Sequence, residues 1–123
     1  MKFDDLSCQV IGKAMEVHNA LGPGLLESAY EQCLAYELSD AGIPFRRQYP
    51  LPVVYKEIKL ECGYRIDLFV DDKIIVEIKS VEQLNRIHEA QLLTYMKLIG
   101  APVGLLINFN VRLLKDGIRR FVI

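Results

Sequence analysis

Asp67, Glu77 and Lys79 are the residues of this sequence whose types and spacing are best suited to chemistry. Glu77 and Lys79 are two positions apart, so on a β-strand they point to the same face. Carboxylate oxygens are the ligands that Mg²⁺ or Mn²⁺ prefers, and a nearby lysine can position or deprotonate water and offset developing phosphate charge. These residues indicate metal-assisted phosphodiester hydrolysis. The alternative is a solvated strand face with exposed ion pairs, each worth under about 1 kcal/mol.

A β-hairpin is expected to bring these residues together. Two apolar-rich runs, 64–70 and 74–79, alternate with period two around Asp71-Asp72-Lys73. If those three residues form the loop, the register of the two strands is determined. This register predicts a wholly apolar face made of Ile66 with Ile78, Leu68 with Val76, and Val70 with Ile74.

The other face of the predicted hairpin carries charge. It places Asp67 opposite Glu77, Arg65 opposite Lys79 and Phe69 opposite Ile75. Two carboxylates that face each other repel unless a cation lies between them. The register therefore also predicts a divalent-metal site, partly covered by Phe69 and Ile75.

Two helices are predicted before the hairpin. Apolar residues recur at helical spacing over 5–21 and again over 25–41, and glycines follow both segments. His18 lies on the apolar side of the first helix, either as a core histidine hydrogen-bonded to a carbonyl or as a group beside the site. Glu27 opens the second helix, where a carboxylate interacts favourably with the helix dipole.

Residues 43–60 are predicted to form one bent edge strand with a turn at Lys56-Glu57, because three prolines interrupt its β-prone residues. Four basic residues lie in this segment, namely Arg46, Arg47, Lys56 and Lys59. They form either a solvated strand edge or a patch that contacts phosphates.

The helix predicted after the hairpin carries two polar residues on its apolar side. It is expected to run over 81–99 with Ser80 as its N-cap. Its apolar arc consists of Leu84, Leu92, Tyr95, Met96 and Ile99, and His88 and Gln91 fall inside this arc. The two polar residues either orient the helix through satisfied hydrogen bonds or point to the active face.

Two strands are predicted to end the chain, a buried central strand over 102–110 and a final strand over 118–123. The resulting order is two helices, three strands, a helix and two strands. This order predicts an α/β (α+β) fold in which helices flank a mixed sheet of about five strands. With 123 residues, 51% of them hydrophobic, the chain is expected to form one domain over 1–123.

Composition limits the cellular compartment and the binding partners that we expect. The three cysteines are widely spaced without a Cys-x-x-Cys pair, which argues against a disulfide framework or a zinc knuckle. The net charge of −1 requires any nucleic-acid contact to come from local basic patches. No apolar run is long enough to span a membrane, and residues 1–5 lack the features of a signal peptide, so we expect a cytoplasmic protein without a membrane partner.

Several spaced motifs occur together in a recognisable order. Asp67 followed by Glu77-Ile78-Lys79 resembles the signature of the PD-(D/E)XK nuclease superfamily, and Gly24-Leu-Leu-Glu27-Ser-Ala-Tyr30 matches the motif of its GxxExxY branch. Further matching stretches are 18–24, 88–95 and 104–110. The resemblance covers nearly the whole chain. Ile66 stands where the name of the superfamily has proline, and the metal needs only the carboxylate that follows.

This resemblance implies a restriction-endonuclease-like core and a DNA nuclease that uses Mg²⁺ or Mn²⁺. Glu27 would join Asp67 and Glu77 as a third metal ligand, and the backbone carbonyl of Ile78 could also contact the metal. Lys79 would activate water, which attacks a phosphodiester in line and leaves a 5′-phosphate. Gln91 and Tyr95 would form the Gln-x-x-x-Tyr element of RecB-type nucleases, on one face of a helix. The substrate-facing residues expected on this basis are Gln91, Tyr95, His88, Tyr30 and Arg65.

An alternative function is a nuclease fold without turnover that serves as a nucleic-acid-binding or protein-interaction module. Such a module would bind DNA after chelation, with a salt dependence that maps to its basic residues. Because a 14.1 kDa chain offers few phosphate contacts and an exposed sheet edge, a homodimer or a partner protein is also expected.

Overall fold

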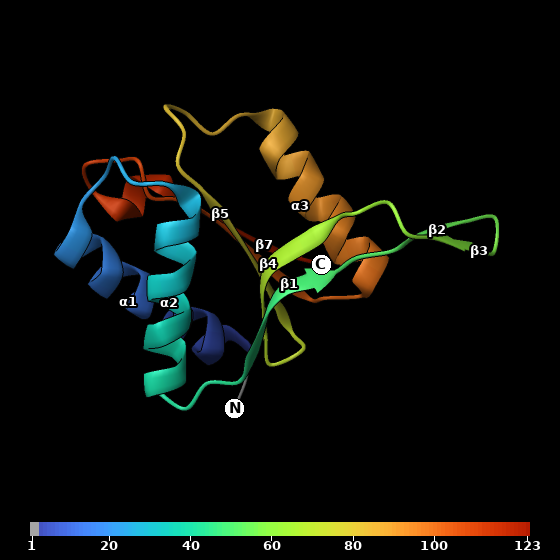
Figure 1. Ribbon diagram of the computed structural model, residues 1–123, viewed down its shortest axis with the longest axis horizontal. Coiled ribbons are helices and arrows are strands. Elements are labelled where there is room, and N and C mark those ends of the chain that lie inside the picture. The colour runs from blue at the N-terminus through green and yellow to red at the C-terminus, as the bar shows by residue number, and fades with distance from the viewer. Residues whose placement is uncertain (1–2) are drawn as a thin grey trace.

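A mixed five-stranded sheet organises the fold. The structure is a computed structural model that describes residues 3–123. Helices α1 (Phe3–Leu21) and α2 (Glu27–Asp40) lie on one side of the sheet, and α3 (Arg86–Ile99) lies on the other (Figure 1). The predicted fold class, helices flanking a mixed sheet, is therefore confirmed. Met1 and Lys2, which begin the segment used to predict the absence of a signal peptide, lie outside the described residues.

The strand order of the sheet is β1-β4-β5-β6-β7. Its strands are β1 (Phe45–Pro50), β4 (Arg65–Val70), β5 (Ile74–Lys79), β6 (Val103–Asn108) and β7 (Ile118–Val122), and the short helix η1 (Leu114–Gly117) precedes β7. Neighbouring strands are antiparallel except β5 and β6, which are parallel. Because β6 lies inside the sheet with helices on both faces, all of its residues are buried, as its apolar sequence predicts.

The sheet separates two apolar clusters. The first includes Val10 of α1 and Leu34 of α2, packed with Val76 of the sheet. The second includes Leu92 and Met96 of α3. Helix α3 can approach β6 closely because residue 104 is glycine: a Cβ atom there would lie 2.5 Å from the sulfur of Met96. No helix within residues 3–123 is both long and apolar enough to cross a membrane.

The segment over 43–60 does not form the single bent strand that we predict from its sequence. Strand β1 ends at Pro50, and the chain then forms a separate hairpin of β2 (Val53–Tyr55) and β3 (Ile58–Leu60), which projects away from the sheet (Figure 1). The predicted turn at Lys56-Glu57 connects these two strands. Pro50 and Pro52 lack the backbone N–H needed to continue a ladder, which explains why the chain leaves the sheet here.

Helix α3 begins five residues later than predicted, at Arg86, and its N-cap is Asn85 rather than Ser80. The side chain of Asn85 accepts hydrogen bonds from the backbone of Ile87 and His88. Ser80 is engaged elsewhere, because its hydroxyl donates to the carbonyl of Leu25, 2.7 Å away. Tertiary contacts of Ser80 therefore hold it outside the helix.

Candidate active site

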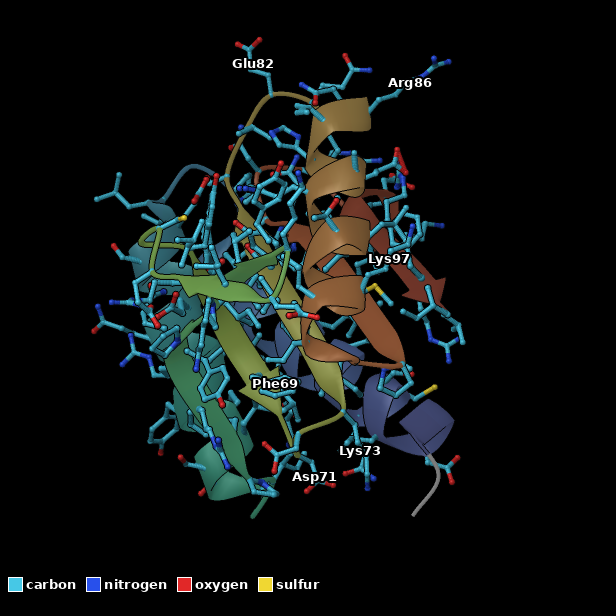
Figure 2. All side chains as sticks on the ribbon, turned by 90° about the vertical axis from the view of Figure 1, so that its right-hand side faces the viewer. Phe69, Asp71, Lys73, Glu82, Arg86 and Lys97 are labelled. Carbon is cyan, nitrogen blue, oxygen red and sulfur yellow. The ribbon has the colours of Figure 1, made fainter. Side chains whose placement is uncertain are left out.

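The β4–β5 hairpin has the predicted register near its turn. Leu68 faces Val76, Phe69 faces Ile75, and Val70 faces Ile74. In Figure 2, the turn residues Asp71 and Lys73 lie at one end of the molecule, whereas Glu82 and Arg86, which follow β5, lie at the other. The carboxylates of Asp67 and Glu77 thus lie on the half of the hairpin that is distant from the turn.

Beyond Leu68, the predicted pairing fails. The pairs of Ile66 with Ile78, Asp67 with Glu77, and Arg65 with Lys79 are absent from the ladder of these described strands. Ile66 packs in the cluster beneath α3, whereas Ile78 packs in the cluster beneath α1 and α2, so the prediction that they share one face is wrong. The alternation of faces breaks between Ile66 and Leu68 of β4, beside Gln48 of the neighbouring strand β1, whose backbone has a left-handed φ of 49°.

Asp67 and Glu77 are linked through backbone amides at the point where the ladder stops. The carboxylate of Asp67 accepts a hydrogen bond from the backbone N–H of Ile78, with Oδ2 2.8 Å from the nitrogen. The backbone N–H of Asp67 in turn donates to Oε1 of Glu77 at 3.3 Å. Side-chain oxygens of Asp67 and Glu77 thus accept the backbone hydrogen bonds that carbonyl oxygens accept in a regular ladder. These bonds hold the two carboxylates close together, as the sequence predicts.

The electrostatics of this pair favour a cation. Glu77 is only 5% exposed, and burial, followed by the charge of Asp67, raises the pKa of Glu77 to about 8. Burial also raises the pKa of Asp67, the Ile78 amide opposes that shift, and the charge of Glu31 adds to it. The charge of Lys79 lowers both pKa values, and a bound divalent ion would act in the same direction.

Glu31 of α2 is the site residue that the sequence reasoning missed. Its side chain is buried, and Oε2 accepts hydrogen bonds from Nη2 of Arg47 at 2.9 Å and from Nε at 3.2 Å. Its other oxygen, Oε1, accepts from the amide of Gln48 at 2.6 Å. A signal was present in the sequence, because Glu31 follows Glu27 by four residues and adjoins the apolar positions Tyr30 and Leu34.

Glu27 lies beside the end of β5. Its Oε2 accepts a hydrogen bond from the backbone N–H of Ser80 at 3.2 Å, one residue after Lys79. The charge of Glu31 is among the causes that raise the pKa values of Asp67 and Glu77. The helix therefore brings two carboxylates to this edge of the sheet, and Glu31 is electrostatically coupled to the buried pair.

Tyr30 holds the loop that leads into Glu27. The ring is fully buried and stacks on Phe109 with a centroid distance of 4.5 Å. Its hydroxyl donates to the carbonyl of Gly22 at 2.6 Å and accepts from the backbone N–H of Leu25 at 3.1 Å. Gly24, between them, has φ of +99°, which glycine adopts readily. The structure thus places Tyr30 in the core, where it orients the loop.

Helix α3 brings Tyr95 toward the carboxylates from the other side of the sheet. Burial and then the charge of Glu77 raise the pKa of Tyr95, and its hydroxyl accepts a hydrogen bond from the Gln91 amide at 3.0 Å. His88 instead accepts a hydrogen bond from the backbone N–H of Asn85 at 3.2 Å within the capping box of the helix. The structure therefore confirms that His88 and Gln91, the two polar residues in the apolar arc, have hydrogen-bond partners. It also places Tyr95 near Glu77.

The remaining candidate residues lie at the margin of the site or away from it. His18 lies 2.7 Å from the carbonyl oxygen of Val111, which confirms its interpretation as a core histidine. Arg65 is exposed at the start of β4, opposite Pro50. Arg46 pairs with Asp72 at 3.4 Å. Since Arg47 also has a carboxylate partner, the basic residues of β1 are not a simple row of free phosphate contacts.

The oxygen-rich donor set suits a hard divalent cation, but it is not closed around one position. Within residues 3–123, no three His, Cys, Asp or Glu side chains are gathered as a metal-binding group. The carboxylates of Asp67 and Glu77 are instead engaged with backbone amides. Because the oxygens of Asp67, Glu77 and Glu31 are chemically suitable, binding requires a rearrangement of side chains rather than different ligands.

Comparison with known proteins identifies a family over almost the whole chain. The family model of the PD-(D/E)XK nuclease superfamily matches residues 4–121. Comparisons with curated proteins and with solved structures give no match. The mixed sheet with helices on both faces agrees with the restriction-endonuclease-like fold of that superfamily. The match suggests a nuclease and thus a nucleic-acid substrate.

Proposed function

Because the chain belongs to the PD-(D/E)XK nuclease superfamily, we propose that it is a nuclease that uses Mg²⁺ or Mn²⁺ to hydrolyse DNA phosphodiesters. The observation that carries this proposal is the linked pair of Asp67 and Glu77, whose pKa values are both raised, with Lys79 two residues further along β5. Placing two carboxylates together in a partly buried site is unfavourable for stability alone. A cation offsets this cost.

The residues have distinct roles in this proposal. Asp67, Glu77 and the backbone carbonyl of Ile78 hold the metal ion, and α2 adds carboxylates from Glu27 and Glu31. The ion, when bound, supplies positive charge that favours hydroxide over water and offsets charge on the phosphate. Lys79 positions or deprotonates the attacking water and stabilises the developing negative charge.

The substrate strand is proposed to pass along the α3 side of the carboxylates. There the hydrogen-bonded pair of Gln91 and Tyr95 would orient the strand, with His88 near the start of the helix and Arg65 at the exposed end of β4. Since Arg46 and Arg47 already have acidic partners, a second subunit or a partner protein would supply further phosphate contacts. Residues 1–123 would act as one nuclease-like domain.

We also propose that the chain belongs to the GxxExxY branch. The motif residues support this through their contacts: Gly24 provides the left-handed turn, Glu27 reaches the end of β5, and Tyr30 secures the loop between them. The spacing of the motif thus corresponds to the conformation of one loop and the start of α2, in which each motif residue has its own contact.

The two α2 carboxylates are expected to differ in their effect on metal binding. Glu31→Gln should weaken Mn²⁺ binding about tenfold or more, because Glu31 is buried and electrostatically coupled to Asp67 and Glu77. Glu27→Gln removes the same charge from an exposed position one turn earlier and should have a smaller effect. Calorimetric titration of each variant measures both affinities. A larger loss for Glu27→Gln would make Glu27 the principal α2 ligand.

The nuclease proposal is tested by incubating the purified chain with single-stranded, double-stranded and branched DNA in the presence of Mg²⁺ or Mn²⁺. We expect metal-dependent cleavage of at least one substrate, products with 5′-phosphate ends, and no cleavage in chelator. If every DNA remains intact while the protein still binds DNA in chelator, the chain is instead a binding module with a nuclease fold. The basic residues would then account for the salt dependence of binding.

A further inference from the structure

Gln48 has an unusual backbone conformation in the middle of β1. Its φ of 49° lies in the left-handed region, which non-glycine residues adopt at a cost of about 1 kcal/mol or more. Among the described residues, the other non-glycine positions with positive φ are Lys56 and Glu57 in one hairpin turn and Asp71 and Asp72 in another. Those four lie where tight turns require this conformation. Gln48 lies within a strand, so its conformation needs another explanation.

This conformation directs two consecutive side chains to the same partner. Successive residues of a strand normally point to opposite faces. Arg47 and Gln48 nevertheless both donate hydrogen bonds to Glu31. The strand also exchanges its two faces at this point. Phe45 and Tyr49 would share a face in a regular strand, but Phe45 packs with the cluster beneath α1 and α2 and Tyr49 with the cluster beneath α3. The left-handed residue thus rotates the strand at the point where β1 passes the carboxylates.

The amide of Gln48 joins two carboxylates from different elements. Its Nε2 atom lies 2.6 Å from Oε1 of Glu31 on α2 and 3.2 Å from Oδ1 of Asp67 on β4. The negative charge of Glu31 raises the pKa of Asp67, so the proximity of the two carboxylates is unfavourable without a hydrogen-bond donor between them. Arg47 donates to Oε2 of Glu31, and the other oxygen, Oε1, accepts the hydrogen bond from Gln48.

We propose that Gln48 is a positioning residue that sets the separation of the Glu31 and Asp67 carboxylates before the metal ion binds. This inference rests on the proposed metal-dependent function. Without the amide, repulsion separates the two carboxylates, and an incoming ion must bring them together again. Binding energy is then spent on ordering the ligands, and affinity falls. The strained conformation of β1 is the structural cost of this arrangement.

Two substitutions separate the amide from the backbone conformation. Gln48→Met keeps a side chain of similar length and removes the hydrogen bonds. Gln48→Gly also removes the amide but accommodates φ of 49° without strain. Lys56→Gly is the matched control, since Lys56 has φ of 48° in an exposed turn and does not contact the carboxylates.

The affinity of each folded protein for Mn²⁺ alone is measured by calorimetry at 25 °C, with melting temperatures in chelator recorded beside it. We expect both Gln48 variants to bind Mn²⁺ at least about tenfold more weakly than the wild type, and Lys56→Gly to bind as the wild type does. Unchanged or tighter binding by Gln48→Met would overturn the inference and leave the proposed function standing. No Mn²⁺ binding by the wild type would overturn both. A loss of melting temperature without a loss of affinity would show a merely structural role and also overturn the inference.

Discussion

Replacement of Lys79 by Met is expected to slow metal-dependent DNA cleavage by about 10³-fold, because an ammonium group positioned at developing charge contributes several kcal/mol to transition-state stabilisation. Lys79 is the cation whose charge acts on both Asp67 and Glu77. Met preserves the length of the side chain. The effect should appear in the single-turnover rate constant for cleavage, measured with saturating metal and with the protein in excess over the DNA.

The design must separate catalysis from metal binding, since loss of the Lys79 charge also raises the pKa values of Asp67 and Glu77. Raising the Mn²⁺ concentration until the rate of each protein no longer changes removes this secondary effect. Lys73→Met is the matched control, because the exposed Lys73 lies at the turn end of the same hairpin, where it pairs with Asp71 (Figure 2). Cleavage by Lys79→Met at the wild-type rate would exclude Lys79 from the chemistry.

Glu77→Gln is expected to stabilise the metal-free protein near pH 8 while abolishing its stabilisation by Mn²⁺. The pKa of Glu77 is raised from 4.5 to about 8 in the folded chain, so between these values the folded state binds more protons than the unfolded state. The free energy of unfolding therefore falls as pH rises from about 4.5 to about 8, by on the order of 1 kcal/mol per pH unit, and is level above that range. The neutral amide removes this loss.

Melting temperatures in chelator between pH 5 and pH 9 measure the effect. The wild type should melt at progressively lower temperature from pH 5 to about pH 8 and at a level temperature above it, with a shallower slope below pH 8 for Glu77→Gln. Addition of Mn²⁺ at pH 8 should raise the melting temperature of the wild type only. Glu82→Gln, on the exposed segment after β5, controls for the change in net charge (Figure 2). Equal slopes for the wild type and Glu77→Gln would show that Glu77 does not destabilise the metal-free fold.

Local patterns predicted much of the fold. The turn at 71–73 and the alternation around it determined the first three pairs of the hairpin, because a shift of one residue would move every apolar side chain to the other face. The apolar run over 102–110 identified the buried strand β6 for a similar reason, since a strand covered on both faces needs no polar alternation. Asp67 and Glu77 could likewise be predicted as neighbours.

Long-range contacts limited the rest of the prediction. The sequence could not assign the N-cap of α3, because Ser80 is as suitable by type as Asn85 and its tertiary hydrogen bonds to Leu25 and Glu27 hold it outside the helix. The start of the hairpin β2–β3 was obscured because prolines allow either a bent strand or an exit from the sheet. In both cases the residue type permits two conformations, and contacts with distant residues select one.

The sequence by itself determined the mixed α/β class, the chemical identity of the carboxylate pair and the position of Lys79, since these follow from periodicity and from spacing along one hairpin. Only the tertiary structure decided that Glu31 joins the pair and that Gln48 connects it to Asp67. Those contacts connect side chains of three different elements, α2, β1 and β4. They also depend on a left-handed residue within a strand, a conformation that glutamine does not favour locally and that the surrounding packing must impose.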